Sequence, residues 1–232
     1  MDFFDEYPCF YKTSIVGSTP NRLNSRYRAM IQANLDCING CSILDIASHD
    51  GRWSFAALKN GARHVLGIEA RHDLVDAAVN TFELENLGND RFTFIENDIY
   101  KQLPKIQPGS IDTVFLFGFF YHTMHHHLLL GSIAALRPKH VILDTRVFPS
   151  GDPVIHITAE DTDEPGNVFP SPVDHLKTSL VGYPSRAAME LMLENFGFRF
   201  HYFDWLSMPV SNWENIEDYR DGLRTTLRAS LG

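Results

Sequence analysis

The residues best suited to chemistry in this chain stand where apolar segments end. The first such segment, residues 42–46, stops at the small and polar residues 47–51, and a helical pattern begins directly afterwards. A strand that turns tightly into a helix leaves unpaired backbone N–H groups at the helix N-terminus, where they can hold a ligand. The turn at 47–51 is therefore the first candidate binding site.

Two further apolar segments end in carboxylates. Segment 64–68 is followed by Glu69, and segment 92–97 is followed by Asp98 and Ile99. An acid at the tip of the second strand of a doubly wound sheet can accept hydrogen bonds from both hydroxyls of a ribose. An acid after the third strand can accept from the exocyclic amine of adenine, and Ile99 can cover one face of the ring. The pattern predicts a nucleoside site.

A fourth apolar segment, 111–117, leads into the sequence Gly-Phe-Phe-Tyr-His at 118–122. The four segment ends together resemble the class I S-adenosylmethionine-dependent methyltransferases over about residues 42–145. In that family the first turn holds the methionine part of the cofactor, the acid after the second strand binds ribose, and the acid after the third binds adenine. The resemblance implies S-adenosylmethionine as the cofactor. The residues expected to bind it are Asp45, Ala47, Ser48, His49, Asp50, Gly51, Glu69, Ala70, Asp98, Ile99, Phe117, Gly118 and Arg26.

The turn departs from the usual family pattern Asp/Glu-x-Gly-x-Gly-x-Gly. Ala47, His49 and Gly51 stand at the three small positions, and Asp50 lies between the last two. A pyridine-dinucleotide enzyme would need Gly-x-Gly-x-x-Gly, so that the backbone could approach a pyrophosphate. A carboxylate in the turn repels a diphosphate and suits a ligand that carries an ammonium and a sulfonium. For the cofactor's own carboxylate we expect Arg26 as the partner.

Transfer of a methyl group to a hydroxyl requires removal of the hydroxyl proton. We expect His122 to be the base, because the loop after the fourth strand faces the methyl group in this family; the alternative is a histidine that caps the following helix. Tyr121 is expected to shape the acceptor site. Asp144, which follows segment 140–143, is the third catalytic candidate, and the alternative for it is an ion pair with Arg146.

A divalent metal ion could instead acidify the acceptor hydroxyl. Asp144 with His156 and Glu160 forms a predicted Mg²⁺ site, because this hard ion takes carboxylate ligands. The histidine run 125–127 also invites a zinc site. Consecutive histidines point in different directions on a helix, however, so we favour a solvated helix face for this run.

The order of the expected elements predicts the fold class. Apolar periodicity predicts helices at 21–35, 52–59, 71–85, 122–136 and 185–195, and strands at 42–46, 64–68, 92–97, 111–117, 140–143, 198–203 and 223–230. This order is typical of an α/β, Rossmann-like, seven-stranded mixed sheet with helices on both faces, the class I methyltransferase fold. We divide the chain into an N-terminal arm and capping helix, 1–41, and a methyltransferase domain, 42–232, with a lid insertion at about 147–183.

Charge and composition limit the partners. Acidic residues outnumber lysine and arginine by 29 to 20, which gives a net charge of −9. Such a protein repels a phosphate backbone unless a basic patch compensates, and the densest basic cluster holds only Arg22, Arg26 and Arg28. Nucleic acid is therefore a disfavoured partner. Without an apolar run of membrane-spanning length, and with an acidic N-terminus, we expect a cytoplasmic protein with no membrane partner.

The acceptor is expected to be a hydroxyl of a polar small molecule, which makes the chain an O-methyltransferase. The motifs Asn-Arg-Leu-Asn-x-Arg-Tyr at 21–27 and Leu-Asp-Ile-Ala-Ser-His-Asp-Gly at 44–51 resemble bacterial O-methyltransferases of mannoside sugars, which implies a sugar acceptor. The stretch 119–122 resembles the wobble-uridine group, so a tRNA-modifying methyltransferase is one alternative. A non-catalytic, cofactor-binding partner subunit is the other. The oligomeric state is left open, including a homodimer.

Overall fold

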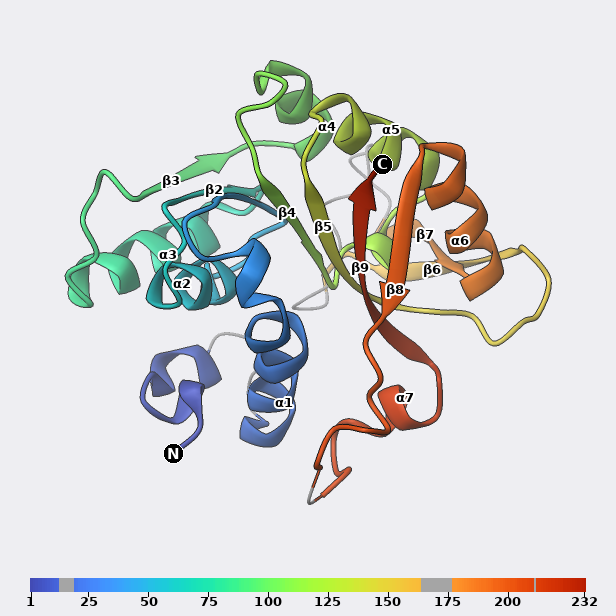
Figure 1. Ribbon diagram of the computed structural model, residues 1–232, viewed down its shortest axis with the longest axis horizontal. Helices are drawn as coiled ribbons and strands as arrows, with labels where there is room; N and C mark the ends of the chain where they lie inside the picture. Colours follow the sequence, from blue (N-terminus) through green and yellow to red (C-terminus); the bar gives the residue numbers. More distant parts are fainter. Residues whose placement is uncertain (13–18, 164–176, 211) are drawn as a thin grey trace.

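A seven-stranded mixed sheet forms the centre of the computed structural model, which describes residues 1–12, 19–163, 177–210 and 212–232 (Figure 1). Across the sheet the strands are β3 (Phe92–Glu96), β2 (His64–Glu69), β1 (Ser42–Ile46), β4 (Thr113–Phe117), β5 (His140–Arg146), β9 (Arg224–Leu231) and β8 (Phe198–Tyr202). The strands from β3 to β5 are parallel, and β9 runs antiparallel to both of its neighbours. The predicted fold class is confirmed.

Helices cover both faces of this sheet (Figure 1). The α-helices are α1 (Pro20–Met30), α2 (Arg52–Lys59), α3 (His72–Leu84), α4 (Ile99–Gln102), α5 (His126–Ala135), α6 (Arg186–Asn195) and α7 (Glu217–Arg220). Short 3₁₀ segments are η1 (Phe3–Asp5), η2 (Pro8–Tyr11), η3 (Gln32–Cys37), η4 (Leu103–Lys105) and η5 (Phe120–His122).

Side chains that alternate along the strands build one hydrophobic core on each face of the sheet. Leu44 of β1 belongs to the core that includes residues of α5 and α6. Its neighbour Ile43 belongs to the other core, which includes Phe55 of α2 and residues of α1. The N-terminal segment joins this second core, because Phe4 and Phe10 are fully buried in it. The division at residue 41 stays a prediction.

The register of the parallel strands places the predicted site residues at one edge. Glu69 at the end of β2 pairs with Glu96 at the end of β3. Phe117 at the end of β4 pairs with Asp144 of β5. Since parallel strands end together, the turns that follow them meet beyond the same edge, which is where open α/β sheets bind ligands.

The insertion expected at 147–183 contains a second, two-stranded sheet. Strands β6 (Ile155–Asp161) and β7 (Thr178–Pro184) pair in antiparallel fashion, and we call them the β6–β7 hairpin. The sequence predicted no strands here, because prolines, glycines and an acidic run mask the short alternation. Residues 164–176, also part of the predicted lid, lie outside the described residues.

Two predicted helices are shorter than expected. The helix predicted over 21–35 ends at Met30, and η3 follows with a non-helical backbone at Asn34. The helix predicted over 122–136 begins at His126, since His122 ends η5. Helix α7 was not predicted, because a four-residue helix is too short to show periodicity.

Among the described residues, no helix has both the length and the apolar composition that crossing a bilayer requires.

The sheet packs tightly around Gly67 of β2, beneath the first turn, and a substitution there tests this packing. A Cβ at this position would meet Cε1 of Phe94 at 2.5 Å and Oγ of Ser48 at 2.9 Å. We expect Gly67→Ala to lower the free energy of unfolding by about 1–3 kcal/mol through overpacking. Gly151→Ala is the control, since a Cβ there meets no atom within 4 Å. Urea unfolding measures both, and equal stability of the two variants would contradict the packing.

Candidate functional site

The turn after β1 follows a left-handed path at alternate residues. Ala47 and His49 each have φ 54°, and Gly51 has φ 73°. These are the three positions at which the family pattern has glycine, which adopts positive φ without a steric penalty. A left-handed residue with a side chain costs about 1–2 kcal/mol. The turn therefore keeps the backbone path of the glycine-rich pattern, although two of its three small positions carry side chains.

Glu69 ties the second strand to this turn. Its Oε2 accepts from the backbone N–H of His49 at 2.9 Å, and its Oε1 accepts from the N–H groups of Ala70 and Arg71 at 2.9 and 3.1 Å. A carboxylate offers about four acceptor positions. One position therefore remains for a ribose hydroxyl, rather than the two that the sequence suggested.

Asp98 and Ile99 stand at the start of α4, after β3. Oδ1 of Asp98 caps this helix by accepting from the N–H of Tyr100 at 2.8 Å. Its Oδ2 has no hydrogen-bond partner among the described residues and can accept from an adenine amine. The Ile99 side chain is almost fully buried and belongs to the core under α4.

Asp50, the acidic residue of the first turn, forms an ion pair within the protein. Asp50 is buried, and its two oxygens accept from Nε and Nη2 of Arg52 at 2.8 and 2.7 Å. Burial alone would raise the pKa of Asp50, but the Arg52 guanidinium lowers it. This ion pair neutralises the carboxylate that the sequence assigned to the cofactor's ammonium.

Asp45 in β1 and Ser48 in the turn are both buried. Burial raises the pKa of Asp45 to about 7, and its Oδ2 accepts from Oγ of Ser54 at 2.6 Å. Ser48 is buried, and its backbone N–H donates to the carbonyl of Ile68 at 3.0 Å. The first contact ties β1 to α2, and the second ties the turn to β2. Both contacts therefore fix the backbone of the turn.

Asp144 is the centre of a buried ionic network. Its Oδ1 accepts from Arg26 at 3.0 Å and from Arg224 at 2.6 Å. Its Oδ2 accepts from the hydroxyls of Tyr219 and Thr226 at 2.8 and 2.7 Å. The side chain is fully buried and all its acceptor positions are filled. Asp144 therefore cannot touch a substrate, and the predicted catalytic role is corrected to a structural one.

Arg26 reaches from α1 to the end of β4. Its guanidinium lies 5.2 Å from the centroid of Trp53, and its Nη2 is 3.9 Å from the place a Cβ of Gly118 would occupy. Phe117 completes this corner with an edge-on contact to Trp53 at 5.8 Å. The Nε atom of Arg26 is buried and has no hydrogen-bond partner among the described residues. It is the donor that could serve the carboxylate of a cofactor.

His122 is held by a carboxylate from the β6–β7 hairpin. Its Nδ1 lies 2.8 Å from Oε2 of Glu160, and both side chains are largely buried, at 12% and 13% exposure. The hydroxyl of Tyr183 donates to Oε1 of Glu160 at 3.2 Å. The ring of Tyr121 lies beside the rings of His122 and Tyr183, with centroid separations of 4.0 and 5.3 Å. The structure thus joins two predicted catalytic residues with two residues of the insertion.

The predicted Mg²⁺ site is not supported. Asp144 is saturated by donors, Glu160 is engaged by His122, and His156 stacks on Phe148 at 4.6 Å. Within the described ranges, no group of three or more His, Cys, Asp or Glu side chains could hold a metal ion. Asp144, His156 and Glu160 therefore do not form a metal-binding group among the described residues.

Of the histidine run 125–127, His125 and His127 are exposed, as expected for a solvated helix face, but His126 departs from that interpretation. His126 is buried, and its Nε2 bonds the carbonyl of Gly182 in β7 at 2.9 Å. Burial lowers the pKa of His126. The ring of His127 packs on Phe196 at 4.6 Å. His126 therefore links α5 to the hairpin, and His127 links it to the end of α6.

Sequence reasoning missed Arg224 and Tyr219, the two partners of Asp144 that come from the C-terminal part of the chain. The sequence suggested Arg146 as the partner of Asp144, but Arg146 lies over the ring of Tyr121, 5.8 Å from its centroid. Arg224 is 80 residues from Asp144 in the chain, and no local spacing connects them. Arg224 of β9 lies opposite Arg146 of β5 in the antiparallel register. Strand pairing, and not sequence proximity, therefore brings Arg224 near Asp144.

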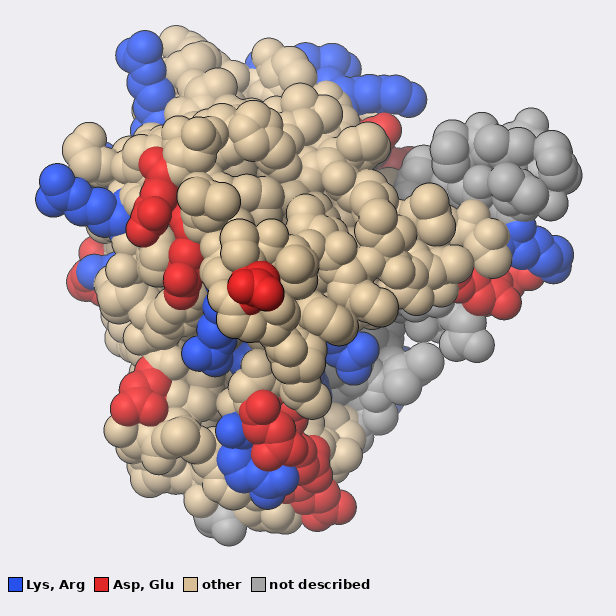
Figure 2. All heavy atoms as spheres, turned by 90° about the vertical axis from the view of Figure 1, so that its right-hand side faces the viewer, with Lys and Arg blue, Asp and Glu red and all other residues tan. Residues whose placement is uncertain are grey.

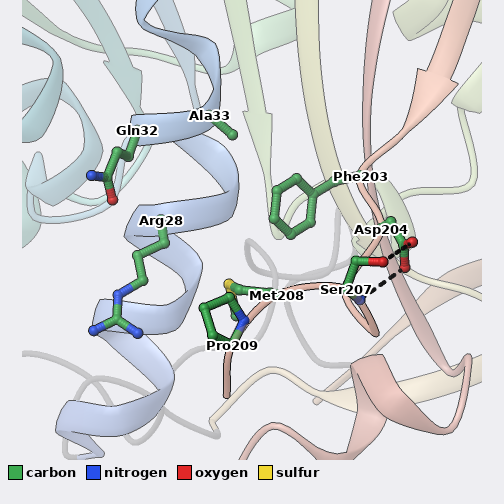
Figure 3. Close-up of a pocket in the computed structure, with 8 residues that line it drawn as sticks. All are labelled: Arg28, Gln32, Ala33, Phe203, Asp204, Ser207, Met208 and Pro209. Carbon is green, nitrogen blue, oxygen red and sulfur yellow. Dashed lines mark hydrogen bonds between the residues drawn. The ribbon is translucent and has the colours of Figure 1, made fainter. Parts of the chain in front are cut away.

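A hollow of about 510 Å³ lies on another side of α1 (Figure 3). Arg28 and Gln32 line one wall, and Phe203 and Met208 line the other. None of the described residues lining it was predicted to bind a ligand. Arg28 is two residues from Arg26, and so faces a different side of the helix.

The domain family and a curated relative match part of the chain. Residues 43–139 match the family model described as a methyltransferase domain. Over 169 residues the chain is 28% identical to the tRNA U34 carboxymethyltransferase of Aliivibrio salmonicida (strain LFI1238). This alignment covers 71% of the chain and 47% of the relative. The chain thus spans about half the length of that relative.

Solved structures share the fold across most of the chain. An S-adenosylmethionine-dependent methyltransferase from Mesorhizobium loti has a TM-score of 0.65 at 15% identity, covering 89% of this chain and 97% of that one. The N-terminal domain of EvdMO1, crystallised in the presence of SAH and D-fucose, has a TM-score of 0.64 at 17% identity and covers 87% and 80%. At these identities the likeness establishes the fold.

The buried network predicts a pH-dependent stability. Although burial opposes it, Arg26 and Arg224 lower the pKa of Asp144 to about 2, while an unfolded aspartate titrates near about 3.9. The folded state therefore binds fewer protons, and stability that is present above about pH 4 is lost as the pH falls through 2. Asp144→Asn should remove this contribution and cost about 3–5 kcal/mol at pH 7, because it leaves two buried guanidiniums without their counter-ion.

Denaturant unfolding at pH 7, 4 and 2.5 measures this difference between wild type and variant. Asp163→Asn, an exposed position on the hairpin, serves as the control. A constant difference between wild type and Asp144→Asn at all three pH values would contradict the assignment.

Proposed function

We propose that this chain, a class I S-adenosylmethionine-dependent methyltransferase by its domain family and its fold, transfers the methyl group to a hydroxyl of a polar small molecule. The observation that carries the proposal is the placement of His122. It follows β4 at the edge where Glu69 and Asp98 end their strands, and its Nδ1 is bonded to Glu160. Its Nε2 has no partner among the described residues and can accept a proton from the acceptor.

The cofactor supplies an electrophilic methyl group on a sulfonium. Of the described residues, Glu69 offers an acceptor for ribose, Asp98 offers one for adenine, and Arg26 offers a buried N–H for the carboxylate. Donors and acceptors of these kinds suit a charged nucleoside.

A sugar is the acceptor we propose first. Tyr121 and Tyr183 provide aromatic surface beside His122, against which the apolar face of a sugar can pack. A structurally similar domain, that of EvdMO1, was crystallised with D-fucose, which supports this acceptor class for the fold.

Modification of tRNA is the second candidate. It is supported by the sequence similarity to a protein named tRNA U34 carboxymethyltransferase over 71% of the chain. The net charge of −9 opposes it. On the face shown in Figure 2, which includes the side of α6 and β6, lysines and arginines are scattered between broad neutral areas and form no continuous stripe.

Binding of the cofactor tests the role of Glu69. We expect Glu69→Gln to weaken the affinity for S-adenosylmethionine about 10-fold, because a charged acceptor is lost from the ribose position. Glu96→Gln is the matched control, since Glu96 is the register partner of Glu69 on the next strand and contacts only the exposed His72 side chain among the described residues. Isothermal titration gives both affinities, and equal affinities would contradict the assignment.

Methyl transfer tests the acceptor. With labelled S-adenosylmethionine and a panel of sugars, glycosides and total tRNA, we expect label in a sugar fraction. His122→Asn should lower that turnover by about 10²–10⁴-fold, the contribution of a positioned base, whereas the exposed control His201→Asn should not. Label in tRNA, falling steeply with salt, would replace the sugar proposal. Cofactor binding with no transfer to any acceptor would favour a non-catalytic subunit.

A further inference from the structure

We propose that Glu160 is a positioning residue that fixes His122 in the tautomer needed for proton abstraction. This inference rests on the proposed function, in which His122 is the base. The geometry joins residues 38 positions apart, with Nδ1 of His122 at 2.8 Å from Oε2 of Glu160. Glu160 lies on β6, in the segment inserted between the fifth strand and α6, so the hairpin contributes to the active site.

The charge state of Glu160 decides the tautomer. Burial would raise its pKa, but hydrogen bonds and charge from His122, and the hydroxyl of Tyr183, lower it. Near neutral pH the group is therefore a carboxylate, which can only accept hydrogen bonds. The proton of a neutral His122 must then reside on Nδ1, where it is donated to Glu160. The lone pair of the ring consequently lies on Nε2.

The hairpin holds Glu160 rigidly enough for this role. Its second oxygen, Oε1, accepts from the hydroxyl of Tyr183 on the paired strand at 3.2 Å. Strand β7 is itself anchored to α5, because Nε2 of His126 bonds the carbonyl of Gly182 at 2.9 Å in a buried contact. The ring of Tyr183 also packs against Tyr121 beside the base. Both oxygens of Glu160 and the strand opposite it are thus fixed.

In the step that this arrangement serves, the acceptor oxygen forms a new C–O bond to the methyl carbon while its proton moves to Nε2 of His122. The C–S bond breaks, and its electron pair stays on sulfur, which becomes a neutral thioether. Nδ1 keeps its proton throughout, so the imidazolium is stabilised by the Glu160 carboxylate and later releases the Nε2 proton to water.

Nitrogen-15 NMR of the histidine rings tests the tautomer without any acceptor. The His122 signals are assigned by their loss in His122→Asn. We expect wild type to show the Nδ1–H form, and Glu160→Ala to shift His122 towards the Nε2–H form, which is intrinsically preferred by free imidazole side chains. Glu160→Gln keeps the volume and should give an intermediate spectrum. Asp163→Asn, near the end of the same hairpin, is the control and should leave the spectrum unchanged.

Kinetics provide the second arm, with the acceptor found in the panel. Glu160→Ala and Glu160→Gln should lower kcat by about 10-fold, which is less than the 10²–10⁴-fold contributed by the positioned base itself. The KM for S-adenosylmethionine should change little, because the hydrogen-bond partners of Glu160 among the described residues are His122 and Tyr183, and neither is a proposed cofactor residue. A merely structural role would change KM or the melting temperature without moving the tautomer.

Three results would overturn the inference. The first is an Nε2–H tautomer in wild type, and the second is a spectrum that Glu160→Ala leaves unchanged. The third is wild-type kcat in both Glu160 variants. If the tautomer responds as expected but His122→Asn keeps full turnover, the proposed base is refuted. In that case the failure lies in the proposed function and not in the contact between the two residues.

Discussion

The buried carboxylate of Asp144 is the constraint on which this end of the molecule depends. A charge taken fully out of water is tolerated only when partners compensate it, and Asp144 receives two guanidinium groups and two hydroxyls. These donors come from α1, α7 and β9, which are far apart in the chain. One anion therefore fixes the N-terminal helix and the antiparallel strand against β5. A neutral residue at this position could not order them in the same way.

The same network extends to the ligand edge. Arg26 is held by Asp144, and so its side chain passes beside Gly118 and Trp53 rather than into solvent. Arg224 lies between Asp144 and Tyr121, at 5.3 Å from the Tyr121 ring, next to His122. Arg26 and Arg224 therefore both neutralise Asp144 and lie beside residues of the proposed site. This dual role explains why a residue at the tip of a strand, such as Asp144, can resemble a catalytic acid in the sequence while serving the fold.

Two features distinguish this site: the left-handed backbone of the turn after β1, and the inserted β6–β7 hairpin. The turn after β1 keeps positive φ at Ala47 and His49, and Glu69 holds it by accepting from the His49 backbone. On the other side, the hairpin supplies Glu160 to His122. The left-handed turn belongs to the parallel sheet, and the hairpin belongs to the insertion. The proposed cofactor residues therefore lie at the edge of the parallel sheet, whereas the proposed base His122 receives its carboxylate partner from the insertion.

The seven strands of the central sheet and the turns at their ends could be predicted from the amino-acid sequence. Hydrophobic periodicity is local, and the residues that follow each parallel strand, such as Glu69 and Asp98, must reach the same edge. The pairing of charges became apparent only in the folded molecule. Arg224 rather than Arg146 meets Asp144, and Glu160 meets His122 rather than a metal ion. Such pairs join residues 38 to 80 positions apart, and their free energy depends on burial and on competing donors, which no local pattern encodes.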